Sequence, residues 1–242
     1  MNKIPFLLFF LVLFFSCDKN NIRVDQIHNI ESITFNHSVD RLPLVIGPDT
    51  CCLDGSLLPY TNNIQQNYNI QTLKYFISNI NLHTHDSIYQ IKDIHFVDVN
   101  DPTTLKILIG NLNNINFTSV SFTFGLDDNL NINESYLNES WHSTMFWPVT
   151  MGGGYHNMKL EGDFDTITKG YTTHLGPTNG MDHSFNKSFL LDLVRNHEST
   201  LSLNINMNIN NWYTSPNDYL LTNEGIMMNM GAQMTLQDNG LN

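Results

Sequence analysis

Residues 201–209 alternate without interruption between apolar and polar side chains. Leu, Ile or Met occupies every second position, and Ser or Asn stands at each position between them. Successive side chains of a β-strand point to opposite faces, so this pattern predicts a strand with one buried side and one solvent-facing side. Such a strand is stable only where another layer covers its apolar face. The chain is therefore expected to contain a β-sheet packed against a second layer.

Similar segments recur along the chain and define the expected fold class. They are rich in β-branched and aromatic residues, and turns containing Gly or Pro separate them. The segments are residues 33–35, 73–82, 91–99, 105–109, 120–124, 155–160 and 171–175. The best candidate for a helix is Asn186 to His197, and the long helical crossovers that a parallel sheet needs are missing. We therefore predict an all-β protein, an antiparallel β-sandwich of about eight or more strands with one short helix.

The N-terminus has the features of an export signal. Lys3 is followed by an apolar run from Ile4 to Phe15 that is broken only by Pro5. The run is shorter than the roughly 20 residues that a membrane-spanning helix needs, and it fits the apolar part of a secretory signal peptide. It ends in Ser16 and Cys17. A small residue before a cysteine at this point resembles the lipobox at which lipoprotein signal peptides are cleaved.

These observations divide the chain into four parts. Residues 1–16 are the predicted signal peptide, and residues 17–30 are a polar tether that is lipidated at Cys17. Residues 31–236 are the predicted folded domain, and residues 237–242 a frayed C-terminus. The expected location is the cell envelope outside the cytoplasm, at the outer membrane or the cell surface, where the lipid holds the protein to the membrane.

The charge balance limits the possible partners. The net charge is −12, and Lys and Arg form no cluster. A nucleic-acid-binding surface needs a basic footprint, so nucleic acid is not an expected partner. Apart from Cys17, the chain contains only the adjacent Cys51 and Cys52, which are too close together for an unstrained disulfide. The apolar core must therefore stabilise the fold without a disulfide framework.

Histidine and methionine are frequent, with 10 of each. These residue types select copper among the first-row metals. The histidines that lie in or beside predicted strands and away from polar turns are His37, His95, His156 and His174. A buried imidazole is unfavourable unless it is hydrogen-bonded or bound to a metal ion. These histidines are therefore candidate metal ligands.

Motifs of common catalytic sites are missing from the sequence. It contains no HExxH, CxxC or GxSxG motif. No nucleophile–base pair and no group of paired carboxylates emerges either. We therefore expect a protein that is not an enzyme.

Several segments together resemble the MbnP-like family, exported copper-associated proteins that include a Bacteroidetes lipoprotein branch. The most specific are Met145–Pro148 (Met-Phe-Trp-Pro) and Gly152–Gly162, which begins Gly-Gly-Gly-Tyr-His. The other segments, in the order of the family, are residues 35–44, 73–80, 94–98, 122–125, 173–176 and 207–212. The resemblance extends over residues 33–235.

The resemblance implies a β-sandwich that handles copper outside the cytoplasm. In methanotroph members of the family, histidines and an oxidised tryptophan hold the metal. The tryptophan in the comparable position is Trp147, but Pro148 follows it, which departs from the methanotroph motif and argues against its oxidation. The implied ligands are His174 and His95 with His156 or His37 as a third, Met145 or Met158 as a soft contact, and Trp147 as a wall.

Two functions are consistent with these residues. In the first, the protein captures or buffers copper without catalysis, together with a metal-delivery or redox partner protein. In the second, it is a metal-free surface module for a glycan or peptide ligand, whose core histidines only form hydrogen bonds.

Overall fold

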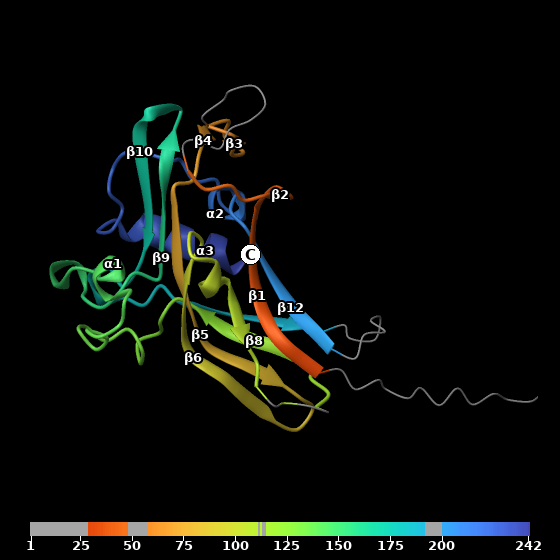
Figure 1. The fold of residues 1–242 in the computed structure, drawn as a ribbon. Helices are drawn as coiled ribbons and strands as arrows, with labels where there is room; N and C mark the ends of the chain where they lie inside the picture. Colours follow the sequence, from red (N-terminus) through yellow and green to blue (C-terminus); the bar gives the residue numbers. More distant parts are fainter. Residues whose placement is uncertain (1–28, 48–57, 111, 113–114, 192–199) are drawn as a thin grey trace, which may run out of the picture.

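The alternating segments form the strands of two β-sheets that pack face to face (Figure 1). The computed structural model describes residues 29–47, 58–110, 112, 115–191 and 200–242. The signal peptide with Cys17 and the pair of Cys51 and Cys52 lie outside the described residues. No helix in the described part is long and apolar enough to cross a membrane. The predicted fold class, an antiparallel β-sandwich with one short helix, is confirmed.

The larger sheet contains eight strands, and all of its strand pairs are antiparallel. They are β3 (Tyr60–Thr61), β4 (Asn67–Tyr68), β5 (Thr72–His83), β6 (Ile88–Asp98), β8 (Ser119–Phe124), β9 (Met158–Phe164), β10 (Thr166–Leu175) and β11 (Phe185–Leu190). The long strand β5 organises this sheet. It pairs with β6, its first residues also pair with β9, and its later residues also pair with β8.

The smaller sheet contains four strands: β1 (Asn29–Val39), β2 (Leu42–Pro43), β7 (Lys106–Leu108) and β12 (Thr200–Asn208). β1 pairs antiparallel with β2 and β7. Its pairing with β12 is parallel, from Asn29 opposite Thr200 to Ser38 opposite Asn208. The smaller sheet therefore joins the first and last strands of the domain.

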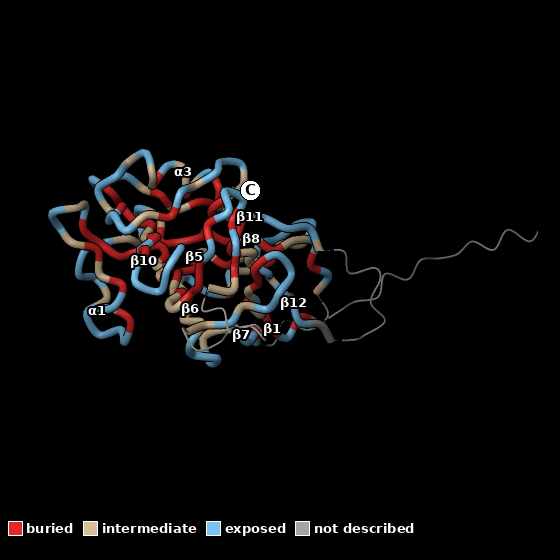
Figure 2. The backbone as a smooth tube through the Cα atoms, turned by 90° about the horizontal axis from the view of Figure 1, so that it is seen from above, coloured by how far each residue is buried: buried red, intermediate tan, exposed pale blue. Residues whose placement is uncertain are grey.

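The main core lies between the inner faces of the two sheets. Figure 2 shows the buried residues gathered along the strands in the middle of the molecule, with exposed residues in the loops around them. The described part also contains three α-helices, α1 (His142–Met145), α2 (Asn211–Thr214) and α3 (Met230–Leu241), and three short 3₁₀ turns at Pro102–Leu105, Val149–Met151 and Thr178–Gly180. α3 packs against α2 and against β10 and β11.

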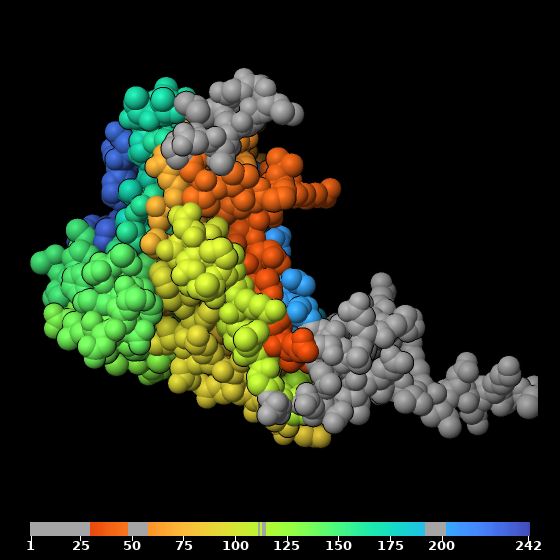
Figure 3. Space-filling view, in the orientation of Figure 1, coloured from red at the N-terminus to blue at the C-terminus, as the bar shows by residue number. Residues whose placement is uncertain are grey.

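The connection from β8 to β9 leaves the sheet and folds over its outer face. We call residues 126–157 the lobe. It is the green region beside the yellow strands in Figures 1 and 3. The lobe has its own small apolar core, in which Trp141, Met145 and Tyr155 pack on Phe76 of β5. The larger sheet is therefore covered by the smaller sheet on one face and by the lobe on the other.

The predicted helix at Asn186–His197 is wrong over its first half. Residues 186–190 belong to β11, which pairs with β8, and residues 192–199 lie outside the described part. The prediction assumed that Phe189 and Leu190 form the buried side of a helix. Instead both side chains are exposed, because β11 is an edge strand of the larger sheet.

The long helix of the described part is instead α3 at the C-terminus. Its buried residues are Gln233, Leu236 and Asn239, so mostly polar side chains mark its inner face. An apolar period of 3.6 therefore could not reveal it. Residues 237–241, predicted to be a frayed end, are its last residues.

Candidate metal centre

The base of the lobe is held by Asn157, at the point where β8 and β9 diverge along β5. The Asn157 backbone N–H donates to the Leu175 carbonyl at 2.7 Å, and its carbonyl accepts from the Phe76 N–H at 3.1 Å. Its side-chain Oδ1 accepts from the backbone N–H of Leu126 at 3.0 Å. The residue before it, His156, is thereby fixed between the lobe and the end of β10.

His156 is almost fully buried, with 5% of its surface exposed. Its backbone N–H donates to the Met145 carbonyl at 2.7 Å, and its Nδ1 lies 3.0 Å from the same oxygen. A carbonyl only accepts, so Nδ1 carries the hydrogen and Nε2 carries a lone pair. That Nε2 is buried and has no hydrogen-bond partner among the described residues.

The environment of His156 keeps its ring neutral. Burial lowers the pKa of His156 to about 3, and the neighbouring His174 contributes in the same direction. Metal ions bind the neutral imidazole, so His156 is in its binding form. A buried acceptor without a partner is unfavourable, and a metal ion at Nε2 would satisfy it.

His174 lies beside His156, and the two ring centroids are 4.8 Å apart with nearly perpendicular planes. On β10, His174 pairs with Lys159 of β9, which places both on the outer face of the larger sheet. The Nε2 atom of His174 lies 2.7 Å from Glu161 Oε1. An ionised carboxylate only accepts, so His174 donates from Nε2 and keeps the Nδ1 lone pair free for another partner.

Glu161 is the carboxylate that orients His174. The hydrogen bond from His174 lowers the pKa of Glu161 to about 2, and Lys159 acts in the same direction. The Lys159 Nζ lies 3.4 Å from Glu161 Oε1, so the carboxylate is already charge-balanced. A carboxylate that holds the second nitrogen of an imidazole is the usual outer partner of a metal-bound histidine.

Trp147 forms one wall of this site. Its ring lies 4.8 Å from the His156 ring in an edge-on arrangement, and its indole N–H donates to the Met151 carbonyl at 3.1 Å. Trp147 is fully buried and lies directly on the backbone of Gly176, where any side chain would collide with the indole.

The two candidate methionines have different surroundings. Met145 contributes its carbonyl to His156, while its side chain packs in the core of the lobe. Met158 belongs to the main core, on the face of β9 opposite to Lys159 and Glu161. The Met158 thioether therefore lies on the other side of the larger sheet from the histidine pair.

The other two candidate histidines lie on the inner side of the larger sheet. His37 Nε2 is 2.9 Å from the hydroxyl of Tyr75. His95 donates from Nε2 to the Thr104 carbonyl at 2.8 Å and stacks on Phe35. Burial lowers the pKa of each histidine to about 4. The four candidate histidines therefore lie on opposite faces of the larger sheet. Only His156 and His174 are in contact with each other.

Sequence reasoning missed Glu161 and Lys159. Both stand on the polar face of a short alternating strand, where charged residues are usually solvated. Only the register of β9 and β10, with Lys159 opposite His174, places them at the site. That register is not visible from either segment alone.

The part of the chain that the structure describes contains no group of three or more His, Cys, Asp or Glu side chains able to hold a metal ion. What this region offers is a pair of imidazole nitrogens, His156 Nε2 and His174 Nδ1, each on a ring that is held at its other nitrogen.

Comparisons with known proteins find a matching family model and a similar solved structure. The model of the MbnP family matches residues 29–230. Among solved structures, the chain is similar to MbnP from Methylosinus trichosporium, with a TM-score of 0.46 and 12% sequence identity over 66% of this chain and 70% of that one. A search of curated proteins gives no match.

Proposed function

Since this chain belongs to the MbnP family, we propose that it captures or buffers copper outside the cytoplasm and catalyses no reaction. The proposal also includes export by the N-terminal signal peptide and anchoring to the membrane by lipid on Cys17. Membership of the family supports copper as the metal. The histidine pair at the base of the lobe supports this region as the binding site.

The observation that carries the proposal is the unpartnered Nε2 of His156. This nitrogen is buried, and its ring is neutral. The ring of His174 lies 4.8 Å away, and its Nδ1 also has no hydrogen-bond partner among the described residues. Imidazole nitrogens are good ligands for copper. In the proposed site His156 Nε2 and His174 Nδ1 bind the ion, and Glu161 and the Met145 carbonyl fix the two rings.

A site with two protein ligands suits capture and release. Two nitrogens leave other coordination positions of the ion available to a ligand from a donor or acceptor. A closed set of four protein ligands, by contrast, is characteristic of structural metal sites. We therefore propose a metal-delivery or redox protein as the partner that supplies or removes the copper.

A competition titration with a Cu(I) chelator tests the site. We expect the full chain to bind one copper ion more tightly than one zinc ion. His174→Ala and His156→Phe should each weaken copper binding by more than about 10–100-fold, the loss typical of an outer partner alone. Glu161→Gln should weaken it by about 10–100-fold, because the ring of His174 loses its charged anchor.

The matched control is His85→Ala, since the side chain of His85 is 94% exposed in the turn between β5 and β6. Its affinity for copper should equal that of the wild type. If the wild type does not compete for copper, or if all variants bind alike, the histidine pair is not a copper site. The metal-free binding or structural module then becomes the better description.

A further inference from the structure

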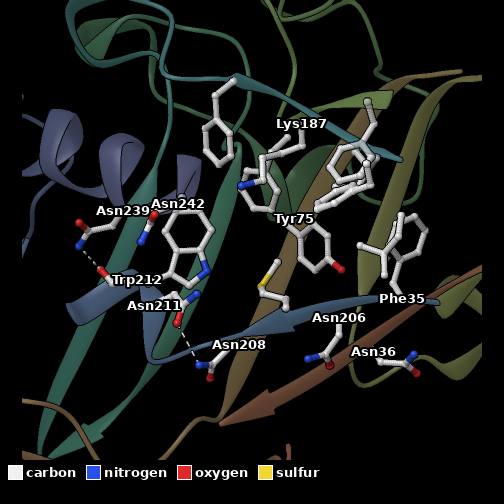
Figure 4. A pocket seen from close by; sticks show the side chains of 18 residues that line it. Phe35, Asn36, Tyr75, Lys187, Asn206, Asn208, Asn211, Trp212, Asn239 and Asn242 are labelled. Atoms are coloured by element: carbon white, nitrogen blue, oxygen red, sulfur yellow. Dashed lines mark hydrogen bonds between the residues drawn. The ribbon is translucent and has the colours of Figure 1, made fainter. Parts of the chain in front are cut away.

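A second feature lies between the two sheets, at the edge where β11 and β12 face each other. Both are edge strands of their sheets, and the gap between them opens into a cavity of about 180 Å³. Figure 4 shows side chains from both sheets around it, with Trp212 and Asn211 of α2 and Asn239 and Asn242 at the end of α3 on one side.

The interior of this cavity is mostly aromatic. Tyr75 and Phe185 each stack on Phe124, with ring centroids 5.3 Å and 5.1 Å from it, and Trp212 lies 5.2 Å from the same ring. Rings of this kind favour a flat apolar guest that can stack or meet them edge-on. Engineered cavities of about 150 Å³ bind benzene, so the space fits one aromatic ring.

The rim of the cavity is polar and carries one charged side chain. Lys187 is the only charged side chain among the described residues that line it. Its Nζ donates to the Leu241 carbonyl at 2.8 Å, and no carboxylate in the described part forms an ion pair with it. Burial lowers the pKa of Lys187, so its ammonium is partly desolvated, and it also lies 6.0 Å over the ring of Phe189.

Amide side chains of the lining add hydrogen-bond donors that suit an anion. Asn211 and Asn242 line the same opening as Lys187. A pocket with apolar walls and a few converging polar groups is the usual form of a small-molecule site. The apolar walls and the Lys187 ammonium together suit a guest with a ring at one end and a negative charge at the other.

We propose that this cavity binds a small aromatic carboxylate, with its ring between the two sheets and its carboxylate on Lys187. The site is separate from the histidine pair, which lies on the outer face of the larger sheet. Binding here therefore does not depend on copper, and the two proposals can fail independently.

Calorimetric titration of the full chain with phenylacetate and with phenylacetamide tests the proposal. The two probes share a ring and differ in charge. We expect phenylacetate to bind about tenfold more tightly or better, because a hydrogen bond to a charged group is stronger than one between neutral groups. Equal affinity of the two probes, or no binding of phenylacetate, would overturn the proposal.

Variants locate the binding site. Lys187→Met keeps the length of the side chain, and it should reduce the affinity for phenylacetate to that of phenylacetamide. Ile205→Trp fills the cavity and should abolish binding of both probes. The control Lys169→Met removes a lysine from the exposed β9–β10 hairpin and should change neither affinity.

Melting temperatures of the variants separate loss of binding from loss of folding. If Ile205→Trp does not fold, the comparison of two probes on Lys187→Met still decides the outcome. A folded Lys187→Met protein that retains the preference for phenylacetate would show that the carboxylate does not bind Lys187.

Discussion

Burial holds three histidines of this protein neutral: His37, His95 and His156. Their pKa values lie at about 4, about 4 and about 3, against a usual value of 6.5. The unfolded chain takes up protons at these positions below pH 6.5, whereas the folded chain resists them until about pH 4 at His37 and His95 and about pH 3 at His156. The stability associated with these groups is therefore complete above about pH 6.5 and is lost as the pH falls from there towards these values.

His95→Gln should reduce this sensitivity to acid. The amide of glutamine can still donate to the Thr104 carbonyl, but it does not titrate. The wild type should lose on the order of 2–3 kcal/mol of stability through His95 between pH 6.5 and pH 4, and the variant should not. Melting temperatures measured across this range show the difference as a shallower slope.

The control for His95→Gln is His85→Gln in the exposed turn. It should follow the pH dependence of the wild type. If His95→Gln and the wild type lose melting temperature in parallel, burial of His95 does not link folding to pH.

At the scale of the elements, period-two alternation predicted the strands well, whereas apolar spacing of the helical kind did not locate the helix. The pattern at residues 201–209 corresponds to β12, where Leu203 is buried and Asn204 and Asn206 are exposed. α3 escaped prediction because its buried face is made by Gln233 and Asn239 as well as Leu236. Apolar periodicity reports only elements that bury apolar faces.

The candidate site was predictable only in part for a related reason. The sequence could show that His156 and His174 lie in strand-like segments. It could not show that His37 and His95 face the other side of the same sheet, because that depends on which strands pair and in which register. The roles of Glu161 and Asn157 likewise appear only when the strands are side by side.

The link between the lobe and the sheet gives a test at this scale. Asn157→Ala removes the acceptor of the buried Leu126 N–H, which costs about 1–3 kcal/mol. Because Asn157 holds the base of the lobe, amide hydrogen exchange should accelerate in residues 126–156 and remain slow in β1 and β12. The exposed Asn129→Ala is the control. Equal acceleration throughout the molecule would contradict a local role for Asn157.

At the scale of the whole molecule, the proposal requires a lipid at the N-terminus. Cys17→Ser should leave an unlipidated precursor, because attachment of the lipid needs the cysteine sulfur. Cells that express either form can be labelled with a clickable palmitate analogue. Label should appear on the wild type alone, and equal label on both would exclude the lipoprotein assignment.

The parallel pairing of β1 with β12 also has a consequence for the order of folding. Paired residues of the two strands are 170 positions apart along the chain, as Ser38 and Asn208 are. Contacts so distant along the chain form late, because closing a long loop loses much chain entropy before any contact compensates for it. Before β12 is available, β1 can pair only with β2 and the three residues of β7. If the chain is exported from its N-terminus, as we propose, it cannot complete its smaller sheet until nearly all of it has emerged.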